Sequence, residues 1–399
     1  MEIANKPLFP ITVADCILRT AYQIAKTPLL PLYAASLGAQ DLTLAIITSI
    51  STITGIFLKP VFGLLSDIMG RKTWLMIGTG FFTIMPFFYN FVDTPQNLMI
   101  LRLFHGTATA IYGPVSLAYV SEISANRISE RFGWFSIARN LGYIIGPLIG
   151  GLLILWMTPT TVISITGFIS AIAFLPFFFL STKTHPLQKK LKIKFPLIFS
   201  IPRKIFSSRY WDLTTILTIS VNTLFIMVKY SIKTFLPIYA YAHGLNPLTI
   251  GLFFSIQETT TLTMSPFAGK LGDIISFHKA IIIGLLIIGL SLNGLNTHSL
   301  IILFGCSILI GITQALFSTN ITAIITKKFN HDFIGMNLGI LGSAKNSGKV
   351  LGPIIIGILI KTFDFGILLS ATSIIFIILG LLWTSYLVLK NIYILSNLN

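Results

Sequence analysis

The sequence predicts an all-α integral membrane protein with 12 transmembrane helices in two six-helix bundles that are related by an internal repeat. Three observations predict it: few charged residues, twelve apolar runs of spanning length, and segments that recur at a constant offset of 206 residues. Charged residues make up 10% of the 399 positions, whereas an ordinary soluble domain carries about 25%. This composition excludes a soluble enzyme and a nucleic-acid binder, despite the net charge of +16.

The apolar runs fall into six before and six after one basic connection. A membrane span needs roughly 20 apolar residues, and its backbone polar groups must be satisfied within the segment, so runs of this length are expected to be helices. We therefore expect an N-terminal bundle over 1–182, a basic cytoplasmic linker over 183–211 and a C-terminal bundle over 212–399. The expected spans lie near residues 9–34, 43–65, 73–92, 97–121, 133–156, 160–181, 212–238, 248–269, 279–295, 299–325, 335–360 and 366–389.

The distribution of Lys and Arg over the connections predicts the orientation. Of the 28 basic residues, eighteen lie in one set of connections and only Lys361 lies in the opposite set. Because cytoplasmic loops carry the excess of positive charge, both termini are expected in the cytoplasm. The first run contains Asp15 and Arg19 and is read as a retained span, not a signal peptide. We expect a multi-pass protein of the plasma membrane (a bacterial inner membrane), monomeric, with the lipid bilayer as its solvent.

Three pairs of segments repeat at the same offset. The first members are LPLYAASLG, GLLSD and GYIIGPLIGG, and the second members are LPIYAYAHG, GKLGD and GKVLGPIIIG. Three matches at one offset indicate that the second half duplicates the first, as in transporters built from parallel repeats around a midplane site. The pairs begin at Leu30 and Leu236, at Gly63 and Gly269, and at Gly142 and Gly348.

These segments carry a family resemblance that covers essentially the whole chain. GLLSDIMGRK resembles the signature of the loop between helices 2 and 3 in the major facilitator superfamily, and RLFHG, from Arg102, resembles its fourth-helix element. GYIIGPLIGG is similar to the fifth-helix signature of its drug:proton antiporters. The resemblance implies a secondary transporter that works by alternating access and exports its substrate.

The loop signature suggests a conformational latch. Asp67 ends the second span, where a carboxylate can face the positive end of a neighbouring helix and pair with a nearby arginine. The resemblance implies that this latch holds the cytoplasmic side shut; the alternative is plain positive-inside signalling by Arg71 and Lys72. The second copy lacks the arginine and should be weaker. The latch candidates are Gly63, Asp67, Gly70, Arg71, Arg131 and Asp273.

The fifth span carries glycines at four-residue spacing beside a proline. Such glycines give one flat helix face that permits close packing, and proline removes a backbone donor and permits a kink. A helix of this kind can rock against its neighbour, although generic small-residue packing would also explain the glycines. The candidates for this helix-kink motif are Gly142, Gly146, Pro147, Gly150, Gly352 and Pro353.

Nine basic residues lie within spans, against two acidic ones, Asp15 and Glu258. Each such group costs roughly 3 kcal/mol at the membrane centre, so it must line water, pair or reach an interface. Asp15 either pairs with Arg19 or takes part in transport. Glu258 is either a proton carrier or a counter-ion for neighbouring lysines. Lys59 is expected to extend to the cytoplasmic interface.

Helical spacing places Arg19, Tyr22 and Lys26 on one face of the first span. Asn222, Lys229 and Lys233 share a face of the seventh, and Arg139 corresponds to Lys345 in the repeat. The resemblance implies that helices 1, 4, 7 and 10 line the central cavity. The predicted proton-coupling residues are Asp15, Glu258 and Arg102. The predicted cavity residues are Arg19, Tyr22, Lys26, Asn222, Lys229, Lys233, Gln314, Arg139, Lys345 and Lys349.

The predicted function is proton-coupled efflux of a small organic molecule, and the basic surplus within the spans favours an anionic or carboxylate-bearing one. Two alternatives remain: a proton symporter that imports an anionic solute, and a non-transporting membrane receptor. Because no nucleophile–base constellation or metal-ligand spacing occurs in the sequence, we expect no enzyme activity, no cofactor and no metal.

Overall fold

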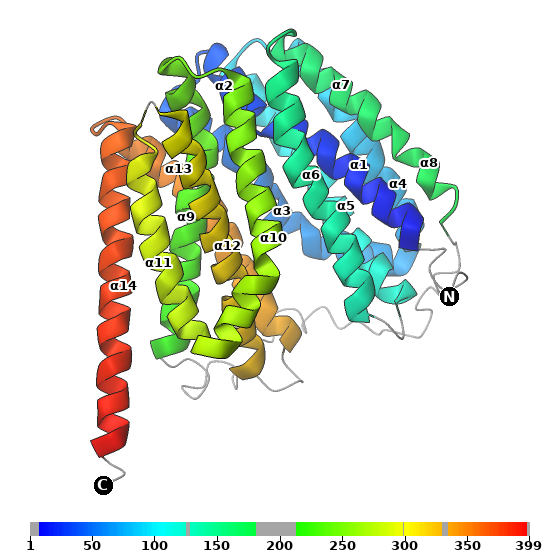
Figure 1. Cartoon of the computed structure of the whole chain (residues 1–399). Helices are drawn as coiled ribbons and strands as arrows, with labels where there is room; N and C mark the ends of the chain where they lie inside the picture. The colour runs from blue at the N-terminus through cyan, green and yellow to red at the C-terminus, as the bar shows by residue number, and fades with distance from the viewer. Residues whose placement is uncertain (1–7, 125–127, 181–212, 298, 329–333, 397–399) are drawn as a thin grey trace. The chain divides into compact units, whose positions relative to one another are not determined.

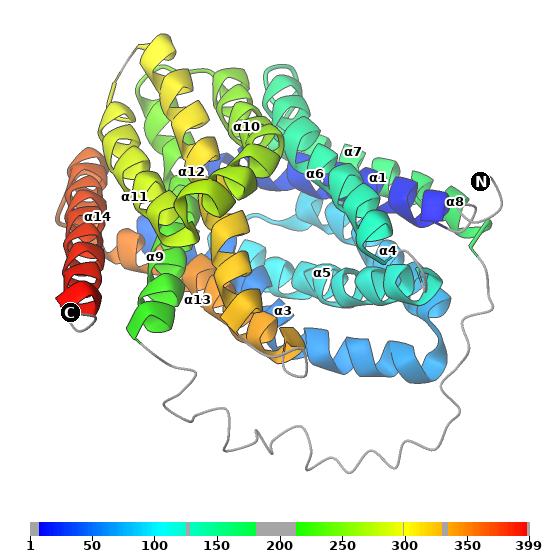
Figure 2. The ribbon, with the colours of Figure 1, turned by 60° about the horizontal axis from the view of Figure 1, so that its bottom comes forward.

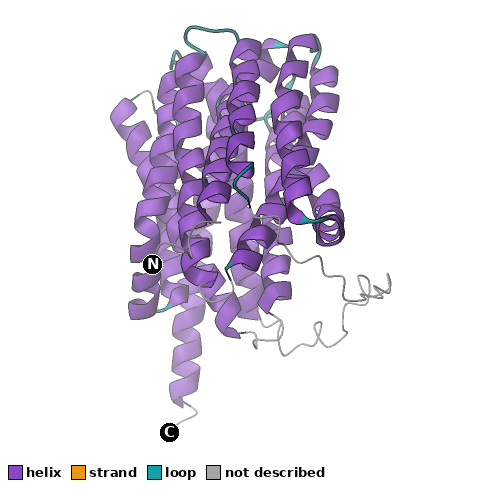
Figure 3. Cartoon of the chain, turned by 90° about the vertical axis from the view of Figure 1, so that its right-hand side faces the viewer, coloured by secondary structure: helices purple, strands orange, loops and turns teal. Residues whose placement is uncertain are grey.

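The computed structural model describes residues 8–124, 128–180, 213–297, 299–328 and 334–396 (Figure 1). Every regular element in these ranges is a helix (Figure 3). The first group comprises α1 (Leu8–Lys26), α2 (Leu29–Ser36), α3 (Asp41–Met69), α4 (Arg71–Ile84), η1 (Met85–Phe91), α5 (Pro95–Ile123), α6 (Ile128–Leu153), α7 (Pro159–Ile172) and α8 (Phe174–Phe177). The second group comprises α9 (Leu213–Ala242), α10 (Pro247–Ile275), α11 (Phe277–Gly294), α12 (Leu300–Lys328), α13 (Ile334–Leu359) and α14 (Phe365–Ser396).

Each expected span coincides with one helix or with two consecutive ones. The first span is divided into α1 and α2, the third into α4 and η1, and the sixth into α7 and α8. By length and hydropathy alone, seven helical segments of the described residues could cross a membrane. They are Asp41–Met69, Glu130–Leu153, Pro159–Phe177, Leu213–Ala242, Phe277–Gly294, Leu300–Lys327 and Phe365–Leu389. The chain is therefore an all-helical, multi-pass membrane protein.

Contacts group the described residues into two compact units. Unit 1 combines Met1–Ser207 with the shorter segments Lys229–Ser255 and Asn346–Ile358. Unit 2 combines Ser208–Val228, Ile256–Lys345 and Leu359–Asn399. Unit 1 thus takes in parts of α9, α10 and α13 from the second half of the chain. The expected linker, 183–211, lies outside the described residues, and the division into bundles over 1–182 and 212–399 stays a prediction.

Long helices pack in pairs within each unit. In unit 1, α1 packs on α6, and α3 lies beside α5 (Figure 2). In unit 2, α11 packs on both α12 and α14. Threonine followed by proline begins both α5 and α7: the hydroxyls of Thr94 and Thr158 accept hydrogen bonds from the backbone amides of Asn97 and Thr161. An N-cap hydroxyl with proline at the first helical position favours a helix start.

The internal repeat is present in the backbone. Gly38 and Gly244, which are 206 positions apart, both have φ of +83°. Gly70 and Ser276, at the same separation, have φ of +93° and +97°. The second half therefore keeps the conformation of the loop signature, although a serine stands where the first half has a glycine.

Replacing Ser276 by glycine is expected to raise the thermal unfolding midpoint of the purified protein. Side chains are strained at φ of +97° and ψ of 147°, at a cost of about 1–3 kcal/mol. The Ser276 hydroxyl accepts from the Lys279 amide at 3.4 Å, but exchanging such a cap for glycine costs only a few tenths of a kcal/mol. The expected net gain is about 1 kcal/mol.

The matched substitution, Gly70→Ser, places a side chain in the same backbone conformation and is expected to lower the midpoint. Equal midpoints for Ser276→Gly and the parent protein would show that the Ser276 backbone is not strained.

Candidate functional site

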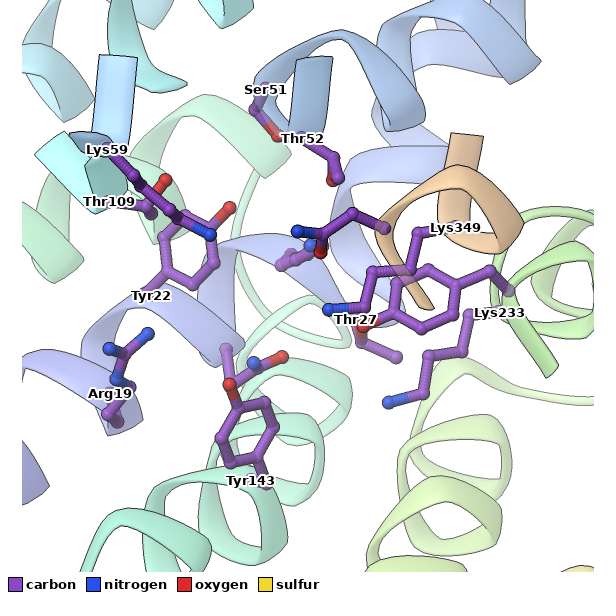
Figure 4. Close-up of a pocket in the computed structure, with 14 residues that line it drawn as sticks. Arg19, Tyr22, Thr27, Ser51, Thr52, Lys59, Thr109, Tyr143, Lys233 and Lys349 are labelled. Atoms are coloured by element: carbon purple, nitrogen blue, oxygen red, sulfur yellow. The ribbon is translucent and has the colours of Figure 1, made fainter. Parts of the chain in front are cut away.

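Unit 1 encloses a cavity of about 120 Å³ with a basic lining (Figure 4). No acidic side chain is among the described residues that line it. Its walls come from α1, α3, α5, α6, α9 and α13. The cations are Arg19, Lys26, Lys59, Lys233 and Lys349, and the uncharged residues are Tyr22, Gln23, Thr27, Ser51, Thr52, Thr109, Tyr143, Tyr230 and Asn346.

Three ammonium groups surround the ring of Tyr230. The Nζ atoms of Lys349, Lys26 and Lys233 lie 5.5, 5.9 and 6.0 Å from its centroid. Lys26 Nζ also lies 5.3 Å from the centroid of Tyr22. Such contacts stabilise a cation by about 0.5–1 kcal/mol or more, much less than a buried carboxylate would, so this cluster retains a strong attraction for an anion.

Asp15 is fully buried and is neutralised by an arginine from another helix. Its carboxylate accepts from Arg139 Nε at 3.0 Å and from Arg139 Nη2 at 2.9 Å, and Nη2 also donates to Ser116 Oγ at 3.1 Å. Arg19 makes only a longer contact, 3.8 Å from Nε to Asp15 Oδ1. The pair therefore joins α1 to α6, while Arg19 lines the cavity.

Arg102 lies in a buried network next to the cavity. Its Nη2 donates to Ser51 Oγ at 2.9 Å, and Nη1 lies 3.5 Å from the Tyr89 hydroxyl. That hydroxyl is 2.9 Å from His105 Nδ1. The ring of Tyr22 packs edge-on against His105, with centroids 5.9 Å apart. Arg102 is thus linked to the lining through Ser51, and it is not itself a lining residue.

The glycine face of α6 lies directly on α1. A Cβ at Gly146 would be 2.4 Å from Gln23 Cβ, and one at Gly142 would be 2.6 Å from Arg19 Cβ. At Gly150 it would be 2.7 Å from the Ile24 carbonyl oxygen. These glycines therefore set the position of the α1 segment that carries Arg19, Gln23 and Lys26.

The same end of α6 packs on α10. A Cβ at Gly151 would lie 2.5 Å from the Pro247 carbonyl oxygen, and one at Gly251 would lie 2.3 Å from the Pro147 carbonyl oxygen. Within unit 1, segments from both halves of the chain thus touch through glycine and proline. In the second copy of the motif, Gly352 is buried. Pro353 borders a pocket of about 20 Å³ that adjoins the basic cavity and shares Lys26, Tyr230, Lys233 and Lys349 with it.

Arg71 is the centre of the loop signature. Its guanidinium donates to Ser66 Oγ at 2.5 Å and to Glu122 Oε1 at 2.8 Å, and it forms an ion pair with Asp67. Arg131 donates to the Ile123 carbonyl. Gly70 begins α4 with φ of +93°, and a Cβ at Gly63 would meet no atom within 4 Å. In the second copy, Asp273 is exposed and pairs with no described cation.

Unit 2 contains the other intramembrane acid. Gln314 Nε2 donates to Glu258 Oε2 at 3.2 Å, and Gln257 Nε2 donates to Gln314 Oε1 at 3.4 Å. Asn222 is buried there, and Lys345 is partly buried. Lys229 is buried in unit 1, next to Tyr230 in sequence but outside the cavity lining.

Five of the ten predicted cavity residues line the basic cavity: Arg19, Tyr22, Lys26, Lys233 and Lys349. Sequence reasoning missed Tyr230 and Tyr143, and it gave Lys59 an interfacial role, whereas Lys59 lines the cavity. The spacing of Tyr230 from Lys233 matches one helical turn and could have indicated it. The remaining assignments of roles stay predictions.

Comparisons with known proteins give the family. The family model of the Major Facilitator Superfamily matches residues 16–246 and again 218–394. An uncharacterised MFS-type transporter of Methanocaldococcus jannaschii is 26% identical over 369 residues, which is 90% of this chain and 92% of that protein. A homologue of the multi-drug resistance efflux pump PmrA from Lactococcus lactis is 25% identical over 90% of this chain and 89% of its own length.

Solved structures agree on the fold. A crystal structure of the nucleoside transporter NupG has a TM-score of 0.78 at 15% identity, with 94% of this chain and 97% of that chain covered. A POT family transporter in complex with 5-aminolevulinic acid has a TM-score of 0.77 at 15% identity and 95% coverage of both chains. The double match of the family model, together with the twofold repeat in the backbone, shows that this chain is a transporter and not an enzyme, and that it belongs to the major facilitator superfamily.

Proposed function

We propose that this protein exports a small organic anion by alternating access, with the proton gradient as the driving force. It has twelve spans in two six-helix bundles, over 1–182 and 212–399, and both termini lie on the cytoplasmic side of a bacterial inner membrane. The helix positions and the eighteen-to-one distribution of basic residues support this topology.

The basic lining of the cavity carries the substrate assignment. Five cations and no acidic side chain are among the described lining residues. In a site of low dielectric, an anion is strongly attracted to such a surface, and a cationic drug is repelled. Two of the relatives named above and several more are called multidrug resistance or efflux proteins, which supports export as the direction.

Close packing of α6 supports alternating access. Its glycine face contacts α1, and its Gly151 and Pro147 contact Pro247 and Gly251 of α10. Interfaces with so little side-chain interlocking can exchange one packing for another. The ion-pair network of Arg71 at the loop signature is the proposed latch for the cytoplasmic side.

Proton coupling is assigned to Glu258, Asp15 and Arg102. Exchange requires that a proton and the substrate compete, so that loading one releases the other. Glu258 is held by a neutral amide from Gln314, an arrangement that a protonated carboxyl can also make. Asp15 is held by Arg139, so its protonation requires this ion pair to be released.

The test is substrate uptake into everted membrane vesicles, in which an exporter accumulates its substrate. The membrane potential is clamped with potassium and valinomycin, and the probes are benzoate, succinate and the cation tetraphenylphosphonium. We expect an anion to accumulate when the lumen is acidic, and Lys349→Ala to reduce its uptake about tenfold, because a cation of the lining is lost.

The control is Lys279→Ala, which removes a lysine at the start of α11, outside the cavity; its uptake should equal that of the parent protein. Accumulation of tetraphenylphosphonium without any anion, unchanged in Lys349→Ala, would contradict the proposal. The basic lining suits an importing symporter equally well, and anion uptake driven by an outward-directed reversal of the pH gradient would support that second function.

A further inference from the structure

The cations of the cavity form two groups at different places in its wall. Lys233 and Lys349, with Lys26, surround Tyr230. In Figure 4, Arg19 and Lys59 lie on one side of the cavity and Lys233 and Lys349 on the other. Lys26 lies between the two groups, because its Nζ contacts the rings of both Tyr22 and Tyr230.

Neither group is neutralised by the protein within the described lining. Lys26 and Lys349 contact aromatic rings, and no carboxylate lines the cavity. Asp15, the nearest buried acid, accepts two hydrogen bonds from Arg139, and Arg19 is 3.8 Å away from it. A single negative charge placed beside Tyr230 therefore leaves the charge of Arg19 and Lys59 without a counter-charge.

The repulsion within each group explains what the ligand must supply. Like charges a few ångströms apart in a site of intermediate dielectric repel one another by several kcal/mol, and one anionic group between them turns this repulsion into attraction. Two groups of cations need two anionic groups, separated by the skeleton of the ligand. The hydroxyls of Ser51, Thr52 and Thr109 line the same cavity and can hydrogen-bond to polar atoms of that skeleton.

From this arrangement we infer that the substrate is an organic dianion whose two anionic groups are separated by a short skeleton, with one group bound at Lys26, Lys233 and Lys349 and the other at Arg19 and Lys59. This inference rests on the proposed anion transport and specifies its substrate class. Monoanions fill only one of the two groups of cations and bind more weakly.

The experiment measures binding to the purified full-length protein in detergent, by isothermal titration calorimetry at constant ionic strength. The probes are the dicarboxylates succinate, glutarate and adipate, each compared with its own monomethyl ester, which has the same skeleton and one charge less. At least one dicarboxylate is expected to bind about tenfold or more tightly than its ester, because the second ion contact is lost in the ester.

Variants locate the two contacts. Lys349→Gln and Arg19→Gln are each expected to bring the ratio of the two affinities close to one, whereas Lys279→Gln, at the start of α11, leaves the ratio unchanged. Equal binding of every dicarboxylate and its ester overturns the dianion assignment and leaves anion transport standing. Absence of binding across the whole series also overturns the dianion assignment, and the vesicle assay with benzoate then decides the proposed function separately.

Discussion

Gly146→Ala is expected to destabilise the protein and to weaken anion binding at the cavity. The new methyl group would stand 2.4 Å from Gln23 Cβ and 3.0 Å from the Gln23 carbonyl carbon, so α1 and α6 must move apart. Overpacking of this kind costs about 1–3 kcal/mol, which exceeds the gain of up to about 1 kcal/mol from replacing glycine by alanine in a helix.

The displacement of α1 also affects the site, because Arg19, Tyr22 and Lys26 are on the same segment as Gln23. We expect a lower thermal unfolding midpoint and a several-fold weaker affinity for the anion that the protein transports. The matched control is Gly80→Ala in α4, where a Cβ meets no atom within 4 Å. Midpoints that rise equally in both variants would show that α6 and α1 are not in close contact.

Much of the fold could be predicted because the lipid solvent restricts what a chain can do. Long apolar runs in a bilayer are helices, so the twelve runs were located, and the described helices coincide with them. The constant offset predicted the repeat, which recurs in the φ values of Gly38 and Gly244. Breaks within spans were missed, such as the one between Lys26 and Leu29, because hydropathy averages over a span and does not register a local turn.

The candidate site was predictable where its residues share a helix. Arg19, Tyr22 and Lys26 follow helical spacing on α1, and all three line the cavity. Contacts between helices were not predictable: the spacing of Asp15 and Arg19 suggested a pair, but the closer partner of Asp15 is Arg139, which is 124 positions away. Lys59 was assigned to the interface from its place near the loop, and only the packing of α3 on its neighbours brings it to the cavity.

Arg139→Gln is expected to destabilise the protein more than any other substitution proposed above. Asp15 is fully buried, and removing Arg139 leaves its charge with the longer Arg19 contact alone. Breaking one partner of a buried ion pair costs about 3–5 kcal/mol, because the other charge remains buried without compensation. Arg19 is then drawn toward Asp15 and away from the cavity, so anion binding should weaken together with the unfolding midpoint.

The double variant Asp15→Asn with Arg139→Gln separates a structural role of this pair from a role in proton coupling. Because no charge is left uncompensated, stability should recover most of the loss, since a neutral pair of similar volume can replace a buried ion pair. Asp273→Asn, at an exposed carboxylate without a described cation partner, should leave the midpoint unchanged. If the stable double variant still accumulates the anion in response to the pH gradient, Asp15 joins α1 to α6 and the proton is carried elsewhere, with Glu258 as the remaining intramembrane acid. If uptake persists but no longer follows the gradient, Asp15 is the coupling residue, and the release of its ion pair with Arg139 is the step that links protonation to the movement of α1.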